Sequence, residues 1–256
     1  MARIVSAIVI PTLGTRSLFL FECLSSIQQC NSVHVCLVSP DIDLGTSLIK
    51  AGFIDQFVID KGNGLSAAIN DAMFELPSNI EYVNWLGDDD LLQADALHKS
   101  EDILKNNPKV GMVYGRCTYV DESLNPIWKN QSGHIAGLIL RFGPCLVPQP
   151  GALFRRSVFD KVGGLRTELK WAFDLDLFIR IKKCSKLRYM PIDVSFFRWH
   201  PNSLSVGLRE GSIREASQVR RSHLPKVLQA ISSLWEFPVR KMTLVAGHIV
   251  SSKTKV

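Results

Sequence analysis

YVNWLGDDDLL, residues 82–92, brings an apolar segment directly onto three carboxylates, Asp88, Asp89 and Asp90. Adjacent carboxylates repel one another and resist burial, so aspartates at the end of a buried strand need a compensating charge. A hard divalent cation such as Mg²⁺ or Mn²⁺ would supply it. Acid–base chemistry and capping of the following helix by Asp89 or Asp90 are the alternatives. Because capping needs only one aspartate, three in a row favour a metal.

Strand and helix patterns alternate on both sides of this segment. Such alternation predicts an α/β domain with a mostly parallel, Rossmann-like sheet and helices on both faces. Ligands of such sheets bind outside the carboxyl ends of the strands, which is where Asp88–Asp90 would lie. The expected strands cover residues 3–12, 33–40, 53–60, 80–86, 110–121 and 186–198, and the expected helices cover 17–30, 64–76, 94–107, 157–165 and 171–183.

Composition excludes several classes of protein. With 256 residues, 46% hydrophobic and 21% charged, the chain is of ordinary globular type, neither disordered nor fibrous. The apolar run near the N-terminus is too short to span a bilayer, so we expect a first strand and a cytoplasmic protein. The six cysteines form no Cys-x-x-Cys pair, which argues against structural zinc and a disulfide framework.

The basic charge is concentrated at the C-terminal end. Residues 209–256 contain nine Lys or Arg and three Asp or Glu, an excess that equals the formal net charge of the whole chain, +6. Within residues 223–237, apolar side chains recur at helical spacing. We expect a basic amphipathic helical tail that contacts an anionic membrane surface, with packing against the domain as the alternative. No nucleic-acid-binding module is recognisable, so nucleic acid is not an expected partner.

Two further segments carry candidate functional groups. Asp174 and Asp176 lie two residues apart on an expected helix and should face different ways. Asp176 has a possible ion-pair partner in Arg180, four residues on. His200 follows an aromatic strand and is either a metal ligand or a packed side chain.

The order of these motifs resembles that of the family 2 glycosyltransferases, which have the GT-A fold and transfer sugars from nucleotide-diphosphate donors. The resemblance extends from about Ile4 to Ser205. It implies a GT-A domain over residues 1–208, with a nucleotide-sugar-binding half (1–125), an acceptor and catalytic-base half (126–208), and the tail at 209–256. The motifs, in family order, are IVIPT (8–12), GLSAAIN (64–70), VNWLGDDDLL (83–92), GALFRRSVFDKVGGL (151–165), WAFDLDLFIR (171–180) and FFRWHPNSLS (196–205).

The resemblance also implies roles for individual residues. Asp174 matches the catalytic base that deprotonates an acceptor hydroxyl, in a single displacement that inverts the anomeric carbon. The implied metal motif, for Mn²⁺ or Mg²⁺, is Asp88, Asp89 and Asp90, with His200 as a further metal or phosphate contact. The implied donor contacts are Pro11, Thr12, Asp41, Lys61, Gly64 and Asn70, and the implied acceptor contacts are Trp171 and Asp176.

Departures from the family pattern leave the nucleotide unidentified. Residues 12–16 lack the usual asparagine, VSPDIDLG (38–45) lacks the usual Asp-Gly-Ser, and Phe173 replaces an acid. The expected function is transfer of a hexose, with UDP-hexose as donor, to a saccharide hydroxyl. The expected acceptor is a lipid-linked intermediate of bacterial surface polysaccharide (O-antigen) synthesis, at the cytoplasmic face of the inner membrane. A nucleotidyltransferase and a non-catalytic carbohydrate-binding assembly subunit are the alternatives.

Overall fold

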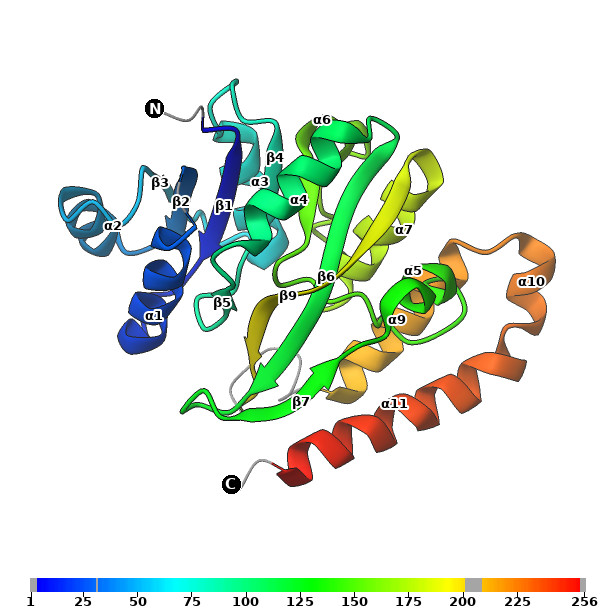
Figure 1. Ribbon diagram of the computed structural model, residues 1–256. Helices are drawn as coiled ribbons and strands as arrows, with labels where there is room; N and C mark the ends of the chain where they lie inside the picture. The colour runs from blue at the N-terminus through cyan, green and yellow to red at the C-terminus, as the bar shows by residue number, and fades with distance from the viewer. Residues whose placement is uncertain (1–3, 31, 201–208, 254–256) are drawn as a thin grey trace.

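The apolar segments of the sequence assemble into one mixed sheet (Figure 1). The computed structural model describes residues 4–30, 32–200 and 209–253. Within these residues the sheet has nine strands in the order β3-β2-β1-β4-β8-β6-β9-β5, and β7 pairs with β6. The strands are β1 (Ser6–Pro11), β2 (Val33–Ser39), β3 (Gln56–Ile59), β4 (Tyr82–Trp85), β5 (Leu91–Leu92), β6 (Val110–Val120), β7 (Pro126–Asn130), β8 (Leu153–Arg155) and β9 (Lys186–Arg198).

The first four strands form a parallel half-sheet. β1 lies between β2 and β4, and β2 also pairs with β3, all in parallel. Residues 6–10 of β1 are all buried, as expected for a strand that is covered on both faces. Beyond β4 the sheet is mixed, because β8 runs antiparallel to β4 and β6 while β9 runs parallel to β6. β8 was not among the expected strands, since its three residues are too few to show a period.

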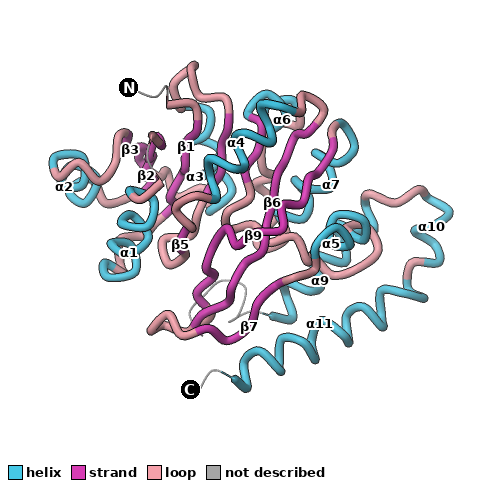
Figure 2. Tube along the Cα trace, in the orientation of Figure 1, coloured by secondary structure: helices cyan, strands magenta, loops and turns pink. Residues whose placement is uncertain are grey.

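Helices cover both faces of this sheet, as Figures 1 and 2 show. Ala7 and Val9 belong to the apolar cluster that includes α3 and α7, whereas Ile8 and Ile10 belong to the one that includes α1 and α4. Alternate side chains of a strand point to opposite faces, so the two clusters lie on either side of one sheet. The expected α/β class is confirmed. The helices are α1 (Ser17–Gln28), α2 (Ile42–Lys50), α3 (Leu65–Glu75), α4 (Ala96–Asn106), α5 (Gly133–Ile139), α6 (Arg156–Lys161), α7 (Phe173–Cys184), α9 (Arg209–Ser222), α10 (Lys226–Ile231) and α11 (Ser233–Lys253).

Residues 209–253 form three helices, and the first of them is part of the core. α9 places Val219 in the same apolar cluster as α7, and Leu224 is buried just after it. The expected single apolar stripe over residues 223–237 is interrupted, because α10 ends at Ile231 and α11 begins at Ser233. Figure 1 shows α11 running beside β7 and α9. No helix in the described part of the chain is both long enough and apolar enough to cross a bilayer.

Candidate active site

The three aspartates form a buried turn between β4 and β5. The backbone N–H of Asp90 donates to the carbonyl of Gly87 at 3.1 Å, which closes the turn. A Cβ atom on Gly87 would lie 2.8 Å from Asp89 Oδ1 and 3.1 Å from Asp90 Oδ2, so any side chain there would displace both carboxylates. All three aspartates are nearly or fully buried. The turn therefore needs counter-charges close by.

Arg16, in the loop between β1 and α1, is the main counter-charge. Its guanidinium forms ion pairs with both Asp88 and Asp89, the second through Nη1 and Oδ2 at 2.5 Å. His200 Nε2 lies 2.8 Å from the same Asp89 oxygen and 3.1 Å from Arg16 Nη1. The Thr12 hydroxyl donates to Asp88 Oδ2 at 2.6 Å. Arg16 therefore provides, from within the chain, positive charge of the kind that the sequence predicted beside the aspartates.

A second arginine holds the far side of the turn. The backbone N–H of Arg198, at the end of β9, donates to Asp90 Oδ1 at 3.0 Å, and its Nε donates to the carbonyl of Asp89 at 3.0 Å. Its side chain is fully buried, pairs with Glu22 at 2.5 Å and lies over the ring of Phe19. The turn is thus fixed between the start of α1 and the end of β9.

Burial and these partners change the acidity of the three carboxyls. Burial raises the pKa of Asp90 well above its usual value, and the neighbouring Asp89 charge adds to the increase. Burial also raises the pKa of Asp88, against the hydrogen bond from Thr12 and the charge of Arg16. Burial acts on Asp89 in the same direction, but the hydrogen bond from His200 and the charge of Arg16 hold its pKa below the usual value. The negative charge of the turn is therefore concentrated beside Arg16 and His200.

The donor atoms at this turn fit a divalent cation in kind. Carboxylate oxygens and an imidazole nitrogen are ligands that Mn²⁺ accepts in proteins. In the described residues, however, no three His, Cys, Asp or Glu side chains are arranged to hold a metal ion. Arg16 bonds to the carboxylate oxygens that such an ion would need. A metal ion would have to displace this guanidinium.

A cleft of about 710 Å³ opens on the Asp88 side of the turn. Three of the predicted donor contacts line it, namely Pro11, Thr12 and Gly64, together with Arg16. Gly64 has φ of 97°, a conformation that favours glycine, and it directly precedes α3. The cleft therefore lies at the carboxyl end of β1, as expected for this type of sheet.

The other three predicted donor contacts have structural partners and do not line the cleft. Asp41 caps α2 by accepting from the backbone N–H of Leu44 at 2.9 Å. Lys61 forms an exposed ion pair with Asp71 at 2.8 Å. Asn70 donates to the carbonyl and accepts from the N–H of one residue, Leu165, at 2.7 and 2.8 Å.

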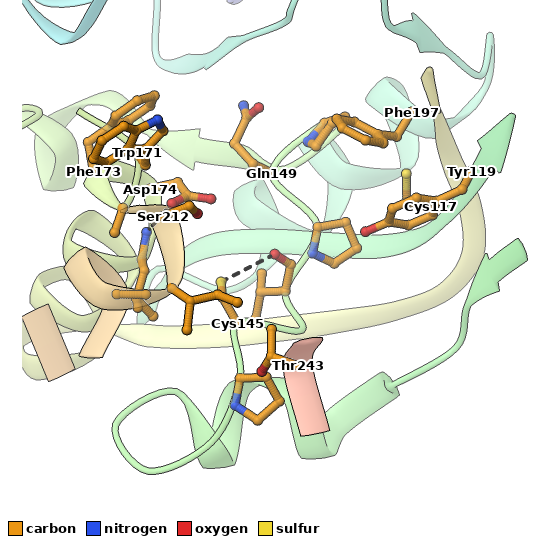
Figure 3. A pocket seen from close by; sticks show the side chains of 18 of the residues that line it. Cys117, Tyr119, Cys145, Gln149, Trp171, Phe173, Asp174, Phe197, Ser212 and Thr243 are labelled. Carbon is orange, nitrogen blue, oxygen red and sulfur yellow. Dashed lines mark hydrogen bonds between the residues drawn. The ribbon is translucent and has the colours of Figure 1, made fainter. Parts of the chain in front are cut away.

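A second cavity, of about 390 Å³, opens on the Asp90 side of the turn. Asp174 and Trp171 both line it, as do residues of α9 and α11. Figure 3 shows Asp174 beside Trp171, Phe173 and Ser212 on one wall of this cavity, opposite Tyr119 and Phe197. Since Asp88 borders the cleft and Asp90 borders this cavity, the aspartate turn separates the two spaces.

Asp174 combines a backbone hydrogen bond with a raised pKa. It lies in the first turn of α7, where its Oδ1 accepts from the N–H of Leu175 at 2.6 Å. Burial raises its pKa to about 6, and the charge of Glu215 adds to the increase. A carboxylate with such a pKa is ionised at neutral pH and is more basic than an ordinary aspartate.

Glu215 of α9 holds the loop that precedes Asp174. Its carboxylate accepts from the backbone N–H groups of Lys170, Trp171 and Ala172 at 2.9, 2.6 and 2.6 Å. These groups precede α7, where N–H groups lack partners within the helix and the helix dipole favours a negative charge. Glu215 therefore positions both Trp171 and Asp174. No motif indicated it, because its partners lie more than 40 residues away.

Asp176 has a structural role, and its expected contact with an acceptor is not supported. Its side chain is fully buried and absent from the cavity wall. It forms ion pairs with Arg180 at 2.6 Å and Arg166 at 3.5 Å, and a hydrogen bond with His223 at 2.7 Å. Arg180, the alternative partner recognised in the sequence, is therefore one of its partners. On α7, Asp174 and Asp176 face different surroundings, as their spacing requires.

Comparison of the sequence and of the backbone with known proteins identifies the type of fold. No family model and no curated protein matches the sequence. Residues 1–349 of TarS from S. aureus, in complex with UDP-GlcNAc, superpose with a TM-score of 0.68 at 12% identity, over 93% of this chain and 73% of that one. The mannosyltransferase PcManGT from Pyrobaculum calidifontis, in complex with GDP-Man and Mn²⁺, gives a TM-score of 0.65 at 16% identity, over 97% and 76%. The chain has a GT-A-like fold.

The chain covers less than half of the longer TarS structure. It spans 41% of the longer TarS structure, with a TM-score of 0.63 at 14% identity and 89% of this chain aligned. At these identities the likeness concerns the backbone alone. Within that backbone the structure brings together two groups of predicted site residues: Thr12, Asp88, Asp89, Asp90 and His200 at the turn, and Trp171 with Asp174 at the second cavity.

Proposed function

We propose that the protein is an inverting glycosyltransferase that transfers a hexose from a nucleotide-diphosphate sugar to a hydroxyl of a saccharide acceptor. The observation that carries the proposal is the aspartate turn, with a cleft on one side and a cavity containing a basic carboxylate on the other. A reaction between two bound substrates needs this arrangement, because both must approach one point from different directions.

The cleft lined by Pro11, Thr12 and Arg16 is the proposed donor site. The structures of similar fold were solved with UDP-GlcNAc and with GDP-Man, which supports a nucleotide sugar as the donor class. Gly62 and Gly64 also line the cleft, just before the 11-residue helix α3. Backbone N–H groups at a helix start bind phosphate well, so the donor diphosphate fits here. We take UDP-hexose as the first donor to test.

A divalent cation, Mn²⁺ or Mg²⁺, is proposed at the turn, supported by the Mn²⁺ in the PcManGT complex. Asp88, Asp89 and His200 would hold it, and it would supply charge stabilisation to the departing diphosphate. Arg16 lies on the donor cleft and pairs with Asp88 and Asp89, so it can turn from the carboxylates toward the donor phosphates.

Asp174 is the proposed catalytic base in the second cavity. Its carboxylate takes the proton of an acceptor hydroxyl while the hydroxyl oxygen bonds to the anomeric carbon. The bond from that carbon to the diphosphate oxygen breaks, and its electron pair leaves with the nucleoside diphosphate. One displacement of this kind inverts the anomeric configuration. Trp171 and the aromatic wall formed by Tyr119 and Phe197 would position the acceptor sugar.

A lipid-linked saccharide of bacterial surface polysaccharide synthesis is the proposed acceptor, used at the cytoplasmic face of the inner membrane. The support is the exposed apolar surface of the C-terminal helices, which includes Val227, Leu234 and Phe237. Basic residues accompany it, and Lys241 Nζ lies 4.7 Å from the ring centroid of Phe237. A surface that combines apolar and basic side chains suits peripheral contact with anionic lipid.

The test is nucleoside diphosphate release from a panel of sugar nucleotides, with Mn²⁺, Mg²⁺ or EDTA. The parent is compared with Asp89→Ala, Asp174→Asn and the control Asp95→Asn, whose carboxylate is 87% exposed and lies outside both spaces. The proposal is supported if release needs a metal ion and is lost in Asp89→Ala and Asp174→Asn but retained in Asp95→Asn. Pyrophosphate release from nucleoside triphosphates would instead identify a nucleotidyltransferase. An Asp174→Asn variant that complements in cells as well as the parent would identify a non-catalytic subunit.

A further inference from the structure

The second cavity contains a buried arginine that has no counter-ion among the residues that the structure describes. Arg220 of α9 lines this cavity and is only 4% exposed. Among the described residues its guanidinium donates one hydrogen bond, from Nη2 to the neutral hydroxyl of Ser217 at 3.1 Å, and its buried Nε has no partner. Burial lowers the pKa of Arg220, yet arginine stays charged in proteins. A buried cation in this situation calls for an anion.

The acidic side chains around Arg220 are engaged elsewhere. Glu236, whose field reaches Arg220, pairs with the neighbouring Arg221 at 2.5 Å. Glu215, on the same helix, accepts the three backbone N–H groups before α7. These carboxylates therefore do not supply the negative counter-charge that Arg220 lacks.

A second buried donor, also without a partner in the described part of the chain, lines the same cavity. The indole Nε1 of Trp171 is buried and has no hydrogen-bond acceptor among the described residues. A Cβ atom on Gly211 would lie 2.9 Å from Cη2 of this indole, so the glycine lets the ring pack closely against α9. Buried polar groups in proteins are normally satisfied, and two exceptions in one cavity indicate a ligand with acceptor atoms.

We propose that Arg220 and Trp171 form an oxyanion subsite, and that the acceptor carries a phosphate or a carboxylate near the hydroxyl that reacts. The guanidinium fork and an N–H donor match the oxygens of such a group. That the bound anion belongs to the acceptor substrate rests on the proposed function, whereas the binding of an oxyanion by Arg220 and Trp171 does not.

The position of the subsite favours the acceptor over the donor. Arg220 and Asp174 line the same cavity, whereas Arg16, Gly62 and Gly64 line the donor cleft beyond the aspartate turn. Cys145 also lines this cavity, and its thiol responds to both charges: burial raises its pKa, the charge of Asp174 adds to the increase, and the charge of Arg220 opposes it. A molecule that places a hydroxyl at Asp174 can therefore place an anionic group at Arg220.

The test is a titration with inorganic phosphate at constant ionic strength, without donor or metal. Binding is followed through the indole N–H resonance of Trp171, assigned by its loss in Trp171→Phe, so that phosphate bound in the donor cleft is not counted. Arg220→Gln is compared with Arg221→Gln, a matched control on the same helix that is exposed and paired with Glu236. Sodium acetate replaces phosphate in a parallel arm.

We expect a saturable shift in the parent and in Arg221→Gln, with at least a tenfold weaker affinity in Arg220→Gln. A response to phosphate but not acetate assigns a phosphate group, and the reverse assigns a carboxylate. Equal affinity in Arg220→Gln and the parent, or no shift with either anion, overturns the proposal. If Arg220→Gln does not fold, Arg220→Lys replaces it, since lysine lacks the Nε–H fork, and an affinity equal to that of the parent is then decisive against the subsite. Absence of nucleoside diphosphate release by the parent protein, with every donor tested, would refute the proposed function and leave this result standing.

Discussion

Removing the side chain of Arg16 tests whether the chain itself supplies the cation that the aspartate turn needs. In Arg16→Ala, Asp88 and Asp89 lose their ion pairs, although their side chains are only 5% and 12% exposed. Breaking a fully buried pair costs about 3–5 kcal/mol, and an exposed pair contributes below about 1 kcal/mol. Because the Arg16 side chain is itself 32% exposed, we expect an intermediate loss, about 2 kcal/mol in EDTA.

The assay is thermal unfolding in EDTA and in Mn²⁺. A loss of about 2 kcal/mol lowers the midpoint by roughly 4–8 °C in a protein of this size. Without the guanidinium, the two carboxylates are open to a cation, so Mn²⁺ should raise the midpoint of the variant more than that of the parent. Lys61→Ala is the control, because its ion pair with Asp71 is exposed and should contribute little.

Two results would refute this reasoning. An Arg16→Ala protein as stable as the parent in EDTA would mean that the turn does not depend on Arg16 for its charge balance. Equal stabilisation of both proteins by Mn²⁺ would mean that Arg16 and the metal do not compete for the same oxygens.

Four further predictions concern Asp174 and the C-terminal helices behind it. Activity should rise with pH through about 6, because burial raises the pKa of Asp174 to about 6 and the base must be ionised; a pH profile of kcat/KM checks this. Since that folded-state pKa lies above the unfolded value of about 4, the folded protein binds this proton more tightly, so stability falls as pH rises from about 4 to 6. Asp174→Asn should therefore be more stable than the parent by about 1–2 kcal/mol at pH 7.5, with a smaller difference at pH 4, as measured by chemical denaturation. Glu215→Gln should lower kcat and also shift the acid limb of the profile to lower pH, because the charge of Glu215 helps to raise the pKa of Asp174; an unshifted limb would contradict this. Deleting residues 209–256 should unfold the domain rather than release a tail, since Ile213, Val219 and Leu224 are buried, and a native circular dichroism spectrum after the deletion would count against it.

The sequence by itself determined the class of fold and the places where polar groups would gather. Apolar runs and helical periodicity are local properties, and they located β1, β2, β4 and β6 as well as α1, α3 and α4, but they did not indicate α2. Because parallel strands end at one edge of a sheet, Asp88–Asp90 could be placed there from their position after a buried strand. The patterns did not indicate β8, whose position is set by pairing with both β4 and β6.

Tertiary structure decided which charges meet when they lie far apart in the sequence. Arg16 meets Asp88 across 72 residues of sequence, and Glu215 meets the loop before α7 across 43 or more. Whether a carboxylate acts as a ligand, a base or a structural anchor depends on the groups that long-range packing sets beside it, and these leave no mark in the local pattern. Asp176, surrounded by Arg180, Arg166 and His223, therefore became an anchor, while Asp174, on the same helix, faces an open cavity.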